Sequence, residues 1–125
     1  MQQANFKLAQ RTTFRRILVI VDANRNPIDL TGCTFEGQAR TVLQFTKNVQ
    51  QDVKPIIFTL TPILPLRLGQ VELKITPEAT ATIQNGEFQF DVIMKKDEDT
   101  FQVIEGTLSL SARVTRPQSG EPYDS

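Results

Sequence analysis

The chain has 125 residues, and its 14 Lys and Arg residues balance 14 Asp and Glu residues, so its formal net charge is zero. This balance lacks the basic surplus of most nucleic-acid-binding proteins, and no apolar run approaches the roughly 20 residues needed to span a bilayer. We therefore expect neither a nucleic acid nor a membrane as a partner.

The length suits one domain, which we place at residues 1–116, followed by a polar, flexible C-terminal tail at residues 117–125. The first residues are polar and lack the apolar core of a signal peptide. A single cysteine, Cys33, cannot form an intrachain disulfide. These features predict a protein that is made and kept in a cytoplasm until it is used.

The first two predicted strands differ in character. Residues 5–10 favour an edge strand with Phe6 and Leu8 facing inward. Residues 17–21, which include Leu18, form an unbroken apolar run. Such a run is typical either of a central strand covered by a loop or of a strand whose outer face meets a neighbouring subunit.

Turn-forming residues at 22–27 predict a link between antiparallel strands. The next strand spans residues 33–41, with small or apolar side chains alternating with polar ones. Cys33 lies at its start, and because the chain has no histidine to act as a base, we interpret this thiol as structural or incidental. Residues 42–53 read as the end of the strand and a loop.

Residues 56–60 predict a short strand, and residues 61–68 follow as an aliphatic segment with two prolines. The prolines exclude regular helix or sheet through it, while its large aliphatic side chains are unlike those of a solvated loop. The segment either plugs one end of the core or docks on another protein. Our candidate partner-contact residues are Ile63, Leu64, Leu66, Arg67, Leu68 and Leu18.

Another strand is expected at residues 69–75, followed by a short helical turn. Thr76 can cap this turn, Pro77 suits the first helical position, and Glu78 lies at the positive end of the helix dipole.

A β-hairpin begins at the Asn85-Gly86 turn pair and continues to Arg116. Its first strand has a period of two, with an apolar face made by Phe88, Phe90, Val92 and Met94. In the returning strand the apolar phase slips by one between Val103 and Leu108, around Gly106. We expect a bulge or a strand break there.

Seven or eight short strands with regular turns and one short helical turn predict an all-β fold. We expect an antiparallel two-sheet sandwich of immunoglobulin-like outline, with a partly open barrel as the alternative.

Residues that could carry chemistry are few. Asp97, Glu98 and Asp99 are adjacent, but the spacing of an EF-hand calcium loop is absent. The sequence also lacks phosphate-binding and nucleophile-elbow motifs. We therefore expect no enzyme, no catalytic or metal-binding residues and no cofactor.

Several motifs occur in a characteristic order between Phe14 and Arg116. They are Pro-Ile-Asp-Leu-Thr-Gly at 27–32, Thr-Phe-Glu-Gly-Gln-Ala-Arg at 34–40, Thr-Pro-Glu-Ala-Thr-Ala at 76–81, Gly-Glu-Phe-Gln-Phe-Asp at 86–91 and the stretch 103–116. In this succession the chain resembles a family of small tailed-bacteriophage proteins, and is similar to the N-terminal domain of phage baseplate upper proteins. Cys33, Phe88 and Phe90 stand where the family usually has tyrosines, and the segment around Leu64 has no counterpart.

The resemblance implies a structural virion protein that connects other parts of the tail, baseplate or neck. Its expected partners are other phage structural proteins, and a homo-oligomer in a symmetric assembly is expected. It would be synthesised in the bacterial host cytoplasm and reside in the virion. The alternatives are a capsid cement protein and a receptor- or carbohydrate-binding module of a tail fibre.

Overall fold

The fold is an all-β sandwich of two sheets, as expected. The computed structural model describes residues 2–41 and 54–113. The elements in chain order are β1 (Gln2–Ala9), β2 (Phe14–Val19), β3 (Cys33–Thr41), β4 (Ile56–Ile57), β5 (Thr59–Pro62), the 3-10 helix η2 (Leu66–Leu68), β6 (Gln70–Ile75), α1 (Pro77–Thr80), β7 (Gly86–Lys96) and β8 (Asp99–Ser111). The expectations for residues 42–53, for the end of the last strand and for the tail at 117–125 lie outside the described residues.

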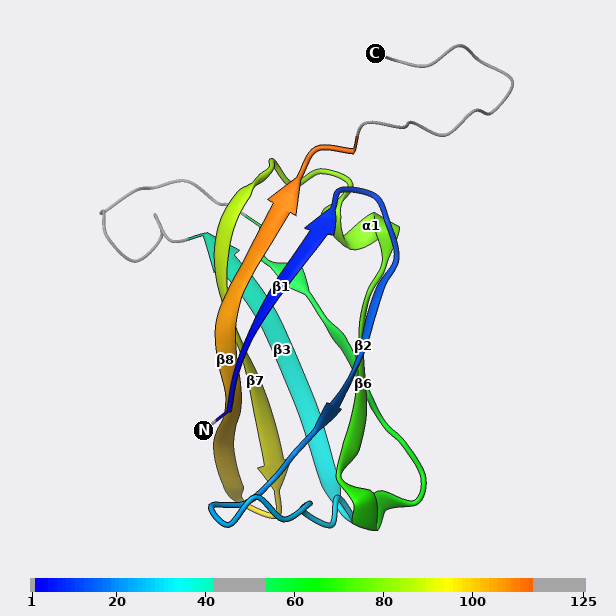
Figure 1. The fold of residues 1–125 in the computed structure, drawn as a ribbon, viewed down its shortest axis with the longest axis vertical. Helices are drawn as coiled ribbons and strands as arrows, with labels where there is room; N and C mark the ends of the chain where they lie inside the picture. The colour runs from blue at the N-terminus through cyan, green and yellow to red at the C-terminus, as the bar shows by residue number, and fades with distance from the viewer. Residues whose placement is uncertain (1, 42–53, 114–125) are drawn as a thin grey trace.

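The two sheets have the strand orders β1-β8-β7-β3-β4 and β2-β6-β5 (Figure 1). In chain order, strands β2 to β8 occupy the places of strands B, C, C′, D, E, F and G of an immunoglobulin sandwich, whose sheets contain the orders B-E-D and G-F-C. The first strand departs from this scheme. Strand β1 lies beside β8 and runs parallel to it, whereas the other strand pairs of both sheets are antiparallel.

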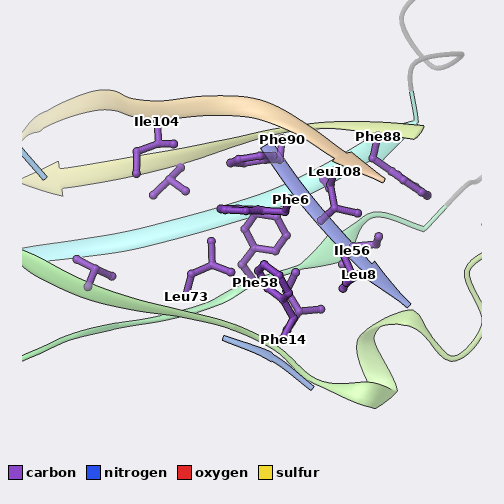
Figure 2. Close-up of a cluster of buried hydrophobic side chains, with 14 of the residues drawn as sticks. Phe6, Leu8, Phe14, Ile56, Phe58, Leu73, Phe88, Phe90, Ile104 and Leu108 are labelled. Atoms are coloured by element: carbon purple, nitrogen blue, oxygen red, sulfur yellow. The ribbon is translucent and has the colours of Figure 1, made fainter. Parts of the chain in front are cut away.

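The core lies between the sheets and is built from the alternating strand positions. Phe88, Phe90, Val92 and Met94 of β7 are all buried, which confirms the predicted inner face of this strand. Figure 2 shows the phenylalanine rings of several elements gathered between the sheets. Phe90 stacks on Phe6 of β1 with ring centroids 4.9 Å apart and meets Phe58 edge-on at 5.6 Å. Phe6 also contacts Phe14 of β2, with ring centroids 5.2 Å apart, and this contact joins the two sheets.

The predicted irregularity in β8 lies near one end of the expected interval. Val92 pairs with Ile104 and Ile93 with Gln102, so Val103 has no partner in the β7–β8 register. This bulge restores the inward direction of the residues that follow it. Gly106 lies beyond the bulge, and its role is to let Ala4 of β1 pass close by.

The predicted helical turn is confirmed, although it is only four residues long. The Thr76 side chain accepts a hydrogen bond from the backbone N–H of Ala79 at 3.2 Å, and Pro77 is the first helical residue. Thr80 is fully buried, and its hydroxyl accepts a hydrogen bond from the Arg11 N–H. The helix therefore closes the end of the sandwich beside the β1–β2 connection (Figure 1).

The loop between β2 and β3 contains a carboxylate with a perturbed titration. The Asp29 carboxylate accepts hydrogen bonds from the Thr31 hydroxyl at 2.7 Å and from the Thr31 N–H at 3.0 Å. Both bonds favour the ionised form, and they lower the pKa of Asp29 below its ordinary value of 3.8. Because the folded pKa is depressed, this group adds stability above pH 3.8 that is lost as the pH falls through the folded pKa.

We predict that the substitution Thr31→Ala raises the pKa of Asp29 toward 3.8, since the hydroxyl makes the largest contribution to the shift. Carbon-detected NMR of the Asp29 carboxyl across an acid titration measures the change. Thr34→Ala, at an exposed position of β3, is the control and should leave the Asp29 curve in place. An unaltered curve in Thr31→Ala would contradict the assignment.

Candidate interaction surface

Strand β2 forms one edge of the three-stranded sheet, where it pairs with β6. Its side chains alternate despite the unbroken apolar run: Leu18 is half-buried and Ile20, just after the strand, is fully buried, whereas Ile17 is 60% exposed and Val19 is 37% exposed. The two exposed residues lie opposite Glu72 and Gln70 of β6. The strand therefore has an aliphatic outer face at a sheet edge, so the expectation of a central strand covered by a loop is wrong, and the expectation of a subunit contact stays a prediction.

The proline-containing segment after β5 divides its aliphatic side chains between core and solvent. Leu66 packs against the core, and its carbonyl accepts a hydrogen bond from the Leu30 N–H at 3.0 Å. Leu64, by contrast, is 78% exposed, and Leu68 is 41% exposed. The segment is thus both a plug and an exposed aliphatic loop.

Hydrogen bonds hold this loop against the end of β2. The Ile20 N–H donates to the Gly69 carbonyl at 2.8 Å. Gly69 has a φ of 68°, and a Cβ on it would lie 2.8 Å from the Ile20 carbonyl oxygen, so only glycine suits this approach. We call the exposed aliphatic side chains of the two segments the apolar edge; its members are Ile17, Val19, Leu64 and Leu68.

The predicted contact residues have different environments. Leu64, Arg67 and Leu68 are exposed, whereas Leu18, Ile63 and Leu66 are half-buried. Sequence reasoning named Leu18 where the structure exposes its neighbours Ile17 and Val19. An unbroken aliphatic run contains no polar residue to set the phase, so the outward positions could be found only from the structure.

Positive charge lies beside the apolar edge. Arg15 of β2 is directly opposite Lys74 of β6, so two cations are cross-strand neighbours. Arg16, on the other side of β2, lies 4.9 Å from the centre of the Phe14 ring. In the described part of the chain, the ion pair is between Lys95 and Glu36 of the other sheet. Arg15, Arg16 and Lys74 form no ion pair with a described residue. As far as the described ranges go, the first half of β2 is therefore a cationic site without a paired carboxylate.

The outer face of the five-stranded sheet carries a polar hollow of about 580 Å³. Its lining consists mainly of amide and charged side chains: Gln3, Asn5, Gln38, Arg40, Gln89, Asp91, Gln102, Glu105 and Thr107, with Phe90 and Gly106. Cross-strand hydrogen bonds order some of them. Gln102 donates to Asp91 at 3.0 Å, and Thr107 donates to Asn5 at 2.8 Å.

The remaining candidate features are the thiol, the acidic tip of the hairpin, metal sites and membrane-spanning helices. Cys33 is buried at the start of β3. Asp97 and Glu98 form the exposed tip between β7 and β8. Among residues 2–41 and 54–113, no cluster of three or more metal-binding side chains occurs. In the same ranges, no helix has the length and apolar character required to cross a membrane.

Comparison with known proteins provides no family assignment. No family model matches the chain, and no curated protein matches it. A solved structure of a family 123 glycoside hydrolase from Clostridium perfringens, which hydrolyses glycolipid glycans, aligns with 91% of the chain at 8% sequence identity and a TM-score of 0.34. The chain spans 24% of the length of that enzyme. This likeness is too slight to support an argument about activity.

Proposed function

We propose that the protein is a structural component of a tailed-bacteriophage particle and connects neighbouring proteins of the tail, baseplate or neck. The succession of motifs between Phe14 and Arg116 supports the phage family. The observation that supports a connecting role is the apolar edge, where Leu64 is 78% exposed and Ile17 is 60% exposed. Exposed aliphatic side chains on a free strand and on the adjoining loop favour association with another protein.

The test of location is electron microscopy and mass spectrometry of purified particles of a phage that carries the gene. The protein should be present at fixed stoichiometry, with its density in the tail, baseplate or neck. A position on the outer capsid surface would instead support the alternative of a cement protein. Complete absence from particles would refute both roles.

A substitution within the apolar edge provides a second prediction. Leu64→Ser should change the free energy of unfolding by less than about 0.5 kcal/mol, because the side chain is 78% exposed, yet it should reduce incorporation into particles. The matched control is Ile57→Ser, at a 55% exposed aliphatic residue of β4 in the other sheet. Quantitative mass spectrometry of particles compares them, and equal incorporation of the two variants would contradict a role for the edge.

A carbohydrate-binding module is the second candidate, and the polar hollow favours it. Its volume of about 580 Å³ is in the range of small-ligand sites, and its amide and carboxylate groups suit sugar hydroxyls. A glycan screen with the wild-type protein and with Gln89→Ala, an exposed position of the hollow, tests it. Binding of a glycan that is weakened by this substitution would support the module, and the lack of any bound glycan would eliminate it.

A further inference from the structure

The edge of β2 is a position where the fold differs from the constant-type immunoglobulin sandwich. In that sandwich the first strand, A, belongs to the sheet of strands B, E and D. Here the equivalent sheet contains only β2, β6 and β5, because β1 lies beside β8 in the other sheet. Within the described part of the chain, the place next to β2 is therefore empty.

An empty place of this kind can accept a strand. The outer side of an edge strand presents backbone N–H and C=O groups that another extended segment can pair with. The other edges of the sandwich are less suited to this. Strand β4 has two residues and β5 ends in Pro62, while the exposed side chains of β1 are polar, with Lys7 among them. Among the strands in the described residues, only β2 combines a free edge of six residues with exposed aliphatic side chains.

The side chains of β2 specify the chemistry of the incoming strand. Ile17 and Val19, in its second half, require apolar neighbours. Arg15 and Arg16, in its first half, lie on opposite sides of the strand, and Lys74 adds a third positive charge beside Arg15. Opposite charges directly across a strand pair are stabilising, and like charges are destabilising. An antiparallel partner should thus carry apolar residues at alternate positions, followed by two adjacent acidic residues.

A second copy of this chain does not offer such a strand. Its adjacent acidic residues are confined to Asp97, Glu98 and Asp99, of which the first two form a turn and the third begins β8. Pairing β2 with β2 of another copy would leave the arginines of both copies without carboxylates. The partner is therefore a different protein.

We propose that β2 accepts, in antiparallel orientation, an extended segment of another protein in which alternating apolar residues precede two adjacent acidic residues. The segment completes the three-stranded sheet in the place of strand A. This inference rests on the proposed connecting function, since it identifies how the contact is made. The charge pattern selects the partner, and the apolar positions and backbone bonds hold it.

A synthetic peptide provides the probe. In acetyl-Ser-Ile-Thr-Ile-Glu-Glu-Thr-amide, the isoleucines are placed to lie opposite Val19 and Ile17, and the glutamates opposite Arg16 and Arg15. The control peptide has Lys-Lys in place of Glu-Glu. NMR titration of the full chain should show about tenfold tighter binding of the Glu peptide, since two favourable charge pairs replace two unfavourable ones. Hydrogen exchange should show new protection of the β2 amides that do not pair with β6.

A charge-reversal variant separates this mechanism from non-specific attraction. In R15E/R16E the preference should invert in favour of the Lys peptide. The control variant K54E/K96E has the same change in net charge at exposed positions outside β2, and it should keep the wild-type preference. Circular dichroism confirms that each variant is folded.

Several results would overturn the inference. Equal affinity for the two peptides would show that charge does not select the partner. Protection of a strand other than β2 would show that the peptide binds elsewhere. Protection, in the free protein, of the β2 amides that do not pair with β6 would show that the place is already occupied: by this chain itself if the protein is monomeric, and by a second copy if it is dimeric. Because none of these measurements uses phage particles, failure of the strand site is distinguishable from absence of the protein in the virion.

Discussion

Replacing Phe90 with alanine is expected to lower the free energy of unfolding by about 4 kcal/mol. Phe90 is 5% exposed and contacts two other rings. It stacks on Phe6 at 4.9 Å with an interplanar angle of 14°, and it meets Phe58 at 5.6 Å with an angle of 63°. The substitution removes these contacts from the centre of the core shown in Figure 2 and leaves a cavity that the flanking strands of both layers cannot fill.

The measurement is urea-induced unfolding followed by circular dichroism. Phe101→Ala is the matched control, because it removes the same side chain from β8, the partner strand of β7, at a position that is 46% exposed. It should cost about 1 kcal/mol or less. A similar loss of stability in both variants would show that the ring cluster does not hold the sheets together.

The inner face of β7 illustrates what could be predicted from sequence. Phe88, Phe90, Val92 and Met94 alternate with polar residues, and the period of two is sufficient to assign their side of the strand. The capped turn at Thr76 was equally accessible, since capping depends on residues close in sequence. Local patterns thus determine the elements and many of their core positions.

Pairings between distant residues account for what sequence reasoning missed. Nothing in residues 2–9 indicates that β1 lies parallel to β8 instead of beside β2. The polar hollow depends on this same pairing, because it gathers residues of β1, β8, β7 and β3 that are far apart in sequence. The free edge of β2 also results from this pairing, because β1 lies beside β8 and not beside β2. The candidate sites therefore follow from strand order, which the alternation of side chains does not specify.

The close pairing of β1 with β8 depends on a single residue, Gly106. The substitution Gly106→Ala is predicted to lower the free energy of unfolding by about 3 kcal/mol. A Cβ at this position would lie 1.6 Å from the carbonyl oxygen of Ala4 and 3.0 Å from the ring of Phe90. The first clash is with backbone, so a change of rotamer cannot relieve it. Strand β1 has to move away from β8, and Phe6 and Leu8 move with it.

Hydrogen exchange combined with urea unfolding measures both consequences. In Gly106→Ala the amides that pair β1 with β8 should exchange faster than those of the β3–β7 pair, because β1 is at the edge of the sheet and can separate alone. Thr107→Ala is the control, since it changes the next residue of β8 on the exposed side and loses one hydrogen bond to Asn5. Its cost should be about 1 kcal/mol or less, without selective exposure of β1. If Gly106→Ala were as stable as this control, β1 would not pack against β8 as closely as the structure requires, and the empty place beside β2 would then be open to β1 itself.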